Sequence, residues 1–174
     1  MQDDVSENVK GYMQRMSPLL FSIFLIMFSY IPWSFSLSNN MRPAVGMVCV
    51  YYWIIHRPDI FNLLSVYILG MFEDILSSIP MGGNIFTFLV LYILLLNLGR
   101  FFNGKPFIVT WYGFAILAFL AFFAKWLMLS IYYGQFLPSI DVLFSYLFSV
   151  AAYPVLSLVN AFIQNYLIQD EVLR

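Results

Sequence analysis

The sequence predicts an all-α polytopic integral membrane protein, a bundle of six transmembrane helices in a single domain of 174 residues. Hydrophobic residues make up 62% of the chain and charged residues 10%, whereas a soluble domain is roughly 45–50% apolar and about 25% charged. The mean hydropathy is +0.84. Charged residues are so rare that they separate long apolar runs, such as residues 16–41 and 142–169. So few charges could not cover the surface of a soluble protein of this size.

The first three spans are predicted from the positions of charges and turn residues, because a membrane-spanning helix needs about 20 mainly apolar residues. Residues 1–15 are expected to form a cytoplasmic N-terminal tail. The second span is short, so we expect neighbouring helices to shield it or its tilt to be small. The predicted spans are 17–36, 42–56 and 59–79, separated by turn residues at 38–40 and 57–59.

The last three spans are predicted in the same way. Two Gly- and Pro-containing segments, 80–84 and 103–106, delimit the fourth span, and a third, 134–138, precedes the sixth. The fifth and sixth spans are long enough to tilt or to extend beyond the hydrocarbon core. The predicted spans are 85–101, 106–133 and 141–168.

Composition also excludes several classes of function. The net charge of −1 does not provide the basic surface that nucleic-acid binding requires. Cys49 and His56 are the only residues of their types, so a multi-cysteine or multi-histidine metal site is excluded. The sequence contains no hydrolase or phosphate-binding motif. We therefore predict a protein that is not an enzyme and needs no cofactor.

The distribution of Lys and Arg predicts the orientation, because these residues are enriched in cytoplasmic loops. Six of the eight fall on one side of the predicted topology, together with both chain ends, so both termini are expected to be cytoplasmic. The six are Lys10, Arg15, Arg57, Arg100, Lys105 and Arg174, and the other two are Arg42 and Lys125.

The same topology predicts a cluster of opposite charges at the periplasmic end of the bundle. Asp74 lies 15 residues beyond residue 59, which is about 22 Å along a helix. The expected members are Arg42, Glu73, Asp74, Lys125 and Asp141. Ionisable residues inside a membrane are costly and commonly functional. One interpretation is structural: the acidic residues pair with Arg42 or Lys125, or cap the following loop. The other is a polar pocket or a docking site for a partner helix.

Small and polar residues on the last span predict close helix packing. Ser145, Ser149 and Ala152 share one face, and small residues allow helices to approach each other. Asn160 and Gln164, four residues apart, are expected to hydrogen-bond to a neighbouring helix. Gly70 is expected to allow a neighbour to approach just before the acidic pair.

A family resemblance rests on a series of short motifs in the first 100 residues. They are Ile31-Pro32-Trp33, Arg42-Pro43, Tyr51-Tyr52-Trp53 and Arg57-Pro58, followed by Gly70, Asp74, Pro80 and Gly82. In order and spacing this series resembles the MreD family of bacterial rod-shape-determining membrane proteins. Two positions depart from the family pattern: Met81 replaces a Leu in the turn, and Glu73 adds a second acidic residue beside Asp74.

The resemblance implies a non-enzymatic scaffold in the bacterial inner membrane that binds MreC. Through MreC it would join MreB, RodA and a penicillin-binding protein in the elongation complex and support lateral peptidoglycan synthesis and rod shape. The family also resembles, in topology, the substrate-binding components of energy-coupling-factor transporters. A vitamin-capturing transporter subunit is therefore the alternative function. The candidate structural or partner-binding residues are Arg42, Pro43, Gly70, Glu73, Asp74, Pro80, Gly82 and Lys125.

Overall fold

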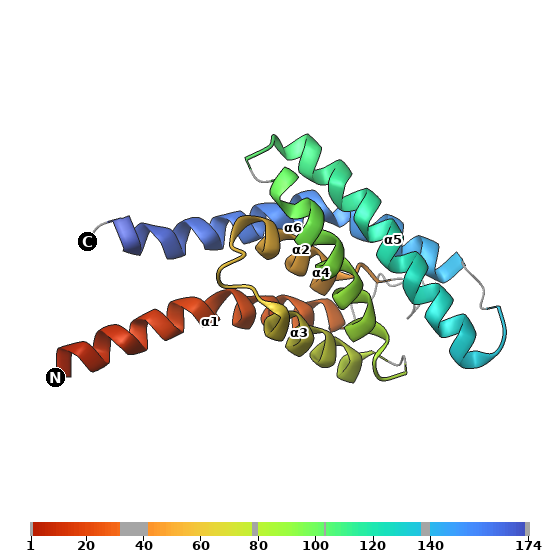
Figure 1. Cartoon of the computed structure of the whole chain (residues 1–174), viewed down its shortest axis with the longest axis horizontal. Helices are drawn as coiled ribbons and strands as arrows, with labels where there is room; N and C mark the ends of the chain where they lie inside the picture. Colours follow the sequence, from red (N-terminus) through yellow and green to blue (C-terminus); the bar gives the residue numbers. More distant parts are fainter. Residues whose placement is uncertain (1, 32–41, 78–79, 103, 137–139, 173–174) are drawn as a thin grey trace.

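The computed structural model describes residues 2–31, 42–77, 80–102, 104–136 and 140–172, and at positions 2–15, 100 and 166–172 it describes the backbone alone. The regular structure in these residues is helical (Figure 1). The six helices are α1 (Gln2–Tyr30), α2 (Val45–His56), α3 (Leu63–Leu76), α4 (Gly83–Phe102), α5 (Phe107–Tyr133) and α6 (Ile140–Val172).

Two of these helices are long and apolar enough to cross a membrane by length and composition, among the residues described. They are α5, and α6 over Ile140–Asn165. Shorter apolar segments occur at Met16–Tyr30, Val45–His56 and Gly83–Gly99. The structure thus shows an all-helical chain with two long candidate spans.

The ends of α1 and α3 differ most from the expected spans. Residues 2–15, expected as a tail, continue α1 as helix. Helix α1 ends at Tyr30, and residues 32–36 of the expected span lie outside the described residues. Helix α3 begins four residues later than expected, at Leu63, because the Asn62 side chain caps it by accepting a hydrogen bond from Ser65 N at 3.1 Å.

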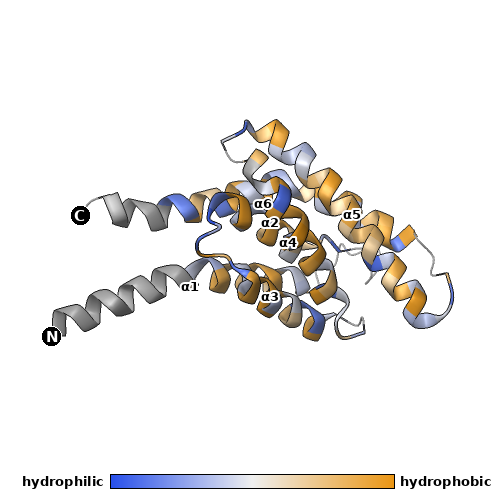
Figure 2. Ribbon diagram, in the orientation of Figure 1, coloured by the Kyte–Doolittle hydropathy of each residue, from blue (hydrophilic) through white to orange (hydrophobic). Residues whose placement is uncertain are grey.

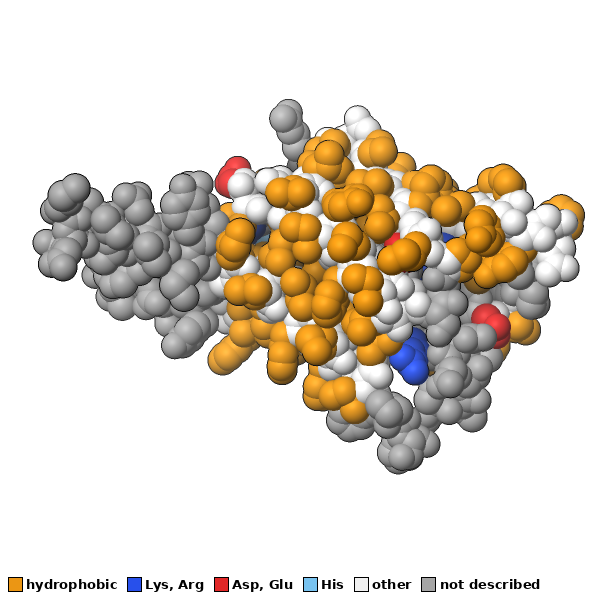
Figure 3. Space-filling view, turned by 90° about the horizontal axis from the view of Figure 1, so that it is seen from below, with side chains coloured by type: hydrophobic (Ala, Val, Ile, Leu, Met, Phe, Trp, Pro, Cys, Tyr) orange, Lys and Arg blue, Asp and Glu red, His pale blue; other side chains and the backbone are white. Residues whose placement is uncertain are grey.

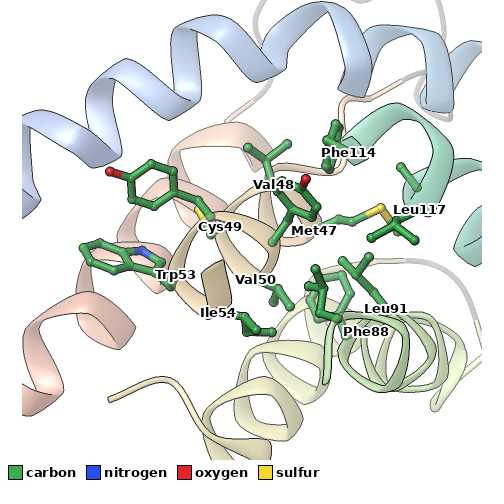
Figure 4. Packing of buried hydrophobic residues seen from close by; sticks show 14 of the residues in the cluster. Met47, Val48, Cys49, Val50, Trp53, Ile54, Phe88, Leu91, Phe114 and Leu117 are labelled. Atoms are coloured by element: carbon green, nitrogen blue, oxygen red, sulfur yellow. The ribbon is translucent and has the colours of Figure 1, made fainter. Parts of the chain in front are cut away.

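Helix α2 lies at the centre of the fold and contacts each of the other five helices. All of its residues except His56 are buried. Figure 4 shows its side chains packed against Phe88 and Leu91 of α4 and against Phe114 and Leu117 of α5. A helix that is hydrophobic on every side is stable only when it is surrounded. The short second element is therefore shielded by its neighbours.

Polar contacts join α2 to α6. Ala44 N, at the start of α2, donates a hydrogen bond to Ser149 Oγ at 2.8 Å. Tyr52 Oη donates to Gln164 Oε1 at 2.7 Å, and Asn160 is fully buried between them. The small and polar face predicted on the last span is thus an internal packing surface.

The outer surface is mainly apolar. In the coloured parts of Figure 2 hydrophobic residues occur on every helix, and hydrophobic side chains are spread over the described part of the face in Figure 3. On α3 the exposed side chains include Leu64, Tyr67 and Ile75, and on α5 they include Ile116 and Ile131. Exposed apolar area on this scale indicates contact with lipid or with other proteins.

Candidate functional site

A pocket of about 140 Å³ lies where the ends of α1 and α3 and the starts of α2, α4 and α6 meet the side of α5. Charged side chains from four different parts of the chain face it: Arg42, Glu73, Lys125 and Asp141. We call it the polar pocket. Its lining consists of Ser29, Tyr30, Arg42, Pro43, Ala44, Glu73, Asn84, Phe122, Lys125, Asp141, Val142 and Ser145. The structure therefore brings four of the five predicted cluster members together around one cavity.

Asp74, the fifth member, instead holds the turn between α3 and α4. Its carboxylate accepts hydrogen bonds from Gly82 N at 2.8 Å, Asn84 N at 2.8 Å and Ile85 N at 3.3 Å. A carboxylate at a helix N-terminus satisfies unpaired backbone N–H groups and favours the helix dipole. Of the alternatives considered from the sequence, pairing of Asp74 with Arg42 or Lys125 is replaced by capping of the loop that follows.

The turn residues fit this role of Asp74. Gly82 has φ = +102°, a conformation that L side chains rarely adopt. Pro80 O accepts a hydrogen bond from Gly83 N at 3.1 Å, which closes the turn before α4. The backbone N–H of Gly82 is thereby directed at the carboxylate. Asp74, Pro80 and Gly82 form one structural unit.

Gly70 allows α3 and α4 to approach each other closely near the turn that joins them. A Cβ at this position would lie 2.7 Å from Ile85 Cα, so a larger residue would force the backbones apart. Ile85 N is one of the donors to Asp74. The close approach at Gly70 is therefore part of the geometry that lets Asp74 reach the start of α4.

Lys125 belongs to a series of hydrogen bonds beside the polar pocket, separate from those that the Asp74 carboxylate accepts. Its Nζ donates to Asn84 Oδ1 at 2.6 Å, and Asn84 Nδ2 donates to Ser77 Oγ at 3.1 Å. Ser77 Oγ in turn donates to Asp74 O at 3.3 Å. Lys125 thus connects α5 to the α3–α4 turn, with Asn84 as its hydrogen-bond acceptor.

Arg42 and Asp141 lie on other sides of the pocket. The Arg42 guanidinium lies 5.2 Å from the centroid of the Tyr30 ring, within the range of a cation–π interaction. Pro43 lies just before the first turn of α2, where its carbonyl oxygen accepts a hydrogen bond from Val45 N at 2.9 Å. Asp141 is in the first turn of α6, where negative charge is favourable. Both charged residues are partly exposed, so the pocket reaches the surface.

Glu73 differs from its neighbours in having an unused acceptor. Its side chain is 7% exposed, and no described residue donates a hydrogen bond to its Oε2 atom. Space for this atom exists because residue 46 is Gly: a Cβ there would fall on Glu73 Oε2. Glu73 is therefore a buried carboxyl group that lines the polar pocket, with its Oε2 atom against α2.

An apolar groove between α5 and α6 continues from the polar pocket. It has a volume of about 300 Å³ and shares Phe122 and Val142 with the pocket. We call it the aromatic groove, and its lining is Phe119, Phe122, Phe123, Trp126, Val142, Leu143 and Tyr146. A charged cavity thus opens beside an aromatic surface.

Of the remaining residues considered from the sequence, His56 is exposed at the end of α2 and Cys49 lies in the core. His56 stacks on the Tyr52 ring, with centroids 4.1 Å apart, and its Nδ1 lies 2.9 Å from Tyr52 O. Cys49 is fully buried. In the part of the chain that the structure describes, no group of three His, Cys, Asp or Glu residues is placed to hold a metal ion. The arrangement at the polar pocket, with two basic and two acidic side chains, suits recognition of a polar or charged group.

Comparison with known proteins gives two matches. A model of the family described as rod shape-determining protein MreD matches residues 10–166, a segment that contains every residue of the polar pocket. An uncharacterized protein of Rickettsia prowazekii (strain Madrid E) is 22% identical over 129 residues, which cover 70% of this chain and 73% of that protein. No solved structure matches the chain. The expected likeness to the components of energy-coupling-factor transporters therefore stays a prediction.

Proposed function

Since the chain belongs to the MreD family of rod shape-determining proteins, we propose that it is an inner-membrane scaffold of the cell-elongation complex that binds MreC. The family match over nearly the whole chain carries this proposal. The family is one of membrane-associated structural proteins that determine cell shape. In the proposed role, binding to MreC recruits the chain to MreB, RodA and a penicillin-binding protein and supports lateral peptidoglycan synthesis.

The proposed topology has six membrane-crossing helices and cytoplasmic termini. Arg57 and Lys105 lie in the α2–α3 and α4–α5 connections, and cytoplasmic connections are enriched in such residues. Lys125 lies 18 residues beyond Phe107, about 27 Å further along α5. This distance is close to the ~30 Å thickness of the hydrocarbon core. The polar pocket then faces the periplasm.

The polar pocket is the proposed docking site for MreC. Its charges fit recognition of a membrane-proximal segment, because partly exposed ionic groups give specificity at an interface. Residues of α1, α3, α4, α5 and α6, and the residues just before α2, line the pocket. Binding there is therefore sensitive to how the helices pack together. The proposed roles divide the candidate residues. Arg42, Pro43, Glu73 and Lys125 line the site, and Gly70, Asp74, Pro80 and Gly82 hold the α3–α4 turn in place.

A pull-down from native membranes in mild detergent tests the proposal. The tagged chain is expected to retain MreC and the elongation synthases, and its depletion is expected to convert rods to round cells. Reversing the charge of both pocket cations, in the double variant R42E/K125E, is expected to abolish MreC recovery. The charge-reversed D59K, at an exposed turn position, is the matched control.

A different set of partners would contradict the proposal. Recovery of an ATPase and a membrane coupling subunit without MreC would identify a vitamin-capturing transporter subunit instead. The comparisons give that alternative no support, because the matched family is one of shape-determining proteins.

A further inference from the structure

We infer that Glu73 is the acceptor for one cationic side chain, a Lys or Arg, which the protein partner inserts into the polar pocket. The inference rests on the proposed function, because it specifies which chemical group of the partner enters this site. It also gives a role to the residue that departs from the family pattern. Four observations on the described residues lead to it.

The first observation is the unpaired state of Glu73. A buried carboxylate costs free energy unless it is hydrogen-bonded or paired with a cation. Glu73 is 7% exposed, and its Oε2 atom receives no hydrogen bond from the described residues. Such an unsatisfied buried group in a native structure needs an explanation, and a cation supplied by a partner would be one.

The second observation is that neither neighbouring cation donates a hydrogen bond to Glu73 Oε2. Lys125 Nζ donates to Asn84 Oδ1 at 2.6 Å, and the Arg42 guanidinium lies over the Tyr30 ring. Asp74, the adjacent acid, takes three backbone N–H groups and is satisfied. Lys125 is near enough to attract the Glu73 carboxylate, but no described residue donates a hydrogen bond to its Oε2 atom.

The third observation is that the position is built for this carboxylate. Gly46 of the central helix is the residue against which Glu73 Oε2 lies, and any Cβ there would occupy the same space. The pocket volume of about 140 Å³ is close to that of a ~150 Å³ cavity that admits benzene. This volume fits the end of one side chain and is far too small for a helix.

The fourth observation favours a polypeptide as the occupant. The aromatic groove adjoins the pocket through Phe122 and Val142, and five of its seven lining residues are aromatic. Aromatic residues are enriched at the centres of protein interfaces. A membrane-embedded helix could place apolar side chains in the groove while a Lys or Arg near its end reaches Glu73, as long cationic side chains do near membrane surfaces.

The test measures two properties of Glu73→Gln, the binding of full-length MreC in detergent micelles and the melting temperature of the free chain. Binding is expected to weaken at least about tenfold, because a buried ion pair loses one partner. The melting temperature is expected to stay equal or to rise, because an unpaired buried charge is removed. Asp59→Asn, an acid-to-amide change at the exposed turn, should alter neither property.

A charge-reversal screen identifies the partner's residue. Glu73→Lys is expected to abolish MreC binding, and suppressors in MreC are expected to replace a Lys or Arg of its membrane-proximal segment by Asp or Glu. Suppressors that restore binding without changing a cation would overturn the inference.

The outcomes of the Glu73→Gln experiment separate the inference from the proposed function. If the wild-type chain does not retain MreC, the proposed function fails and the inference fails with it. If the wild-type chain and Glu73→Gln bind MreC equally, the inference alone is wrong. A lower melting temperature in Glu73→Gln would assign Glu73 to internal packing. Loss of a copurified amine-bearing phospholipid, with MreC binding intact, would make the occupant a lipid headgroup.

Discussion

Glu73 and Asp74 are adjacent acids with different environments, because successive helical side chains point about 100° apart. Asp74 faces the start of α4 and accepts three backbone hydrogen bonds. Glu73 faces the polar pocket and the space left by Gly46. The first carboxylate fixes the fold of the α3–α4 turn, and the second is the proposed recognition group. Substitutions at the two positions should therefore have opposite effects on stability.

Asp74→Asn should destabilise the chain by about 2–3 kcal/mol, because an amide offers one acceptor oxygen and removes charge-assisted bonds to backbone N–H groups. Thermal or denaturant unfolding in detergent measures this change. Asp141→Asn, at the first turn of α6, is a milder control with an expected loss of at most about 1 kcal/mol.

The charge swap D74K/K125D distinguishes capping from ion pairing at Asp74. We expect no rescue by the second substitution, because Lys125 donates to Asn84 and Asp74 accepts from the backbone. A double variant as stable as the wild type would show that Asp74 acts through Lys125, contrary to the hydrogen bonds described above.

At the scale of the helices, the contact between α2 and α6 explains how a short apolar helix is held in the centre. The Ala44 N–H group is satisfied by Ser149, and the Tyr52 hydroxyl is satisfied by Gln164. These two contacts lie at different positions along α6, so they fix both the distance between α2 and α6 and the register of the two helices. Small residues at such a contact allow the backbones to approach.

Ser149→Leu should destabilise the chain by about 1–3 kcal/mol or more, because a larger side chain enters a fully buried contact and the Ala44 N–H group loses its acceptor. The melting temperature in detergent should fall accordingly. The matched control is Val155→Leu, which introduces the same residue at a position of α6 that is 65% exposed and should be nearly neutral. Equal melting temperatures for the two variants would contradict the proposed α2–α6 contact.

At the scale of the whole molecule, the sequence is informative about which segments are helical and less so about what surrounds them. Helix α5 occupies Phe107–Tyr133 where hydropathy predicts 106–133, because a long apolar run between turn residues leaves few alternatives. Hydropathy alone does not place α2 at the centre, since lipid and protein interior favour the same residues. The gathering of Arg42, Glu73, Lys125 and Asp141 follows from helix length and direction. The partner of Asp74 does not, because backbone N–H groups carry no sequence signal.

The membrane topology is tested directly at α3, a helix that is short for a full crossing. Its 14 residues span about 21 Å, less than the ~30 Å hydrocarbon core. A short helix crosses if the bilayer thins locally or if flanking residues complete the path. Cysteine labelling is well suited to this chain, because its one native cysteine, Cys49, is fully buried.

New cysteines before and after α3 should label from opposite sides of the membrane. Met81→Cys, at a position in the α3–α4 turn that is 78% exposed, should react with a membrane-impermeant maleimide in intact spheroplasts. Asp59→Cys, in the α2–α3 connection, should react only after permeabilisation. The parent chain, with Cys49 alone, should stay unlabelled in both conditions. Labelling of both positions from one side would mean that α3 does not cross, and the reverse pattern would put the pocket in the cytoplasm, away from any periplasmic segment of MreC.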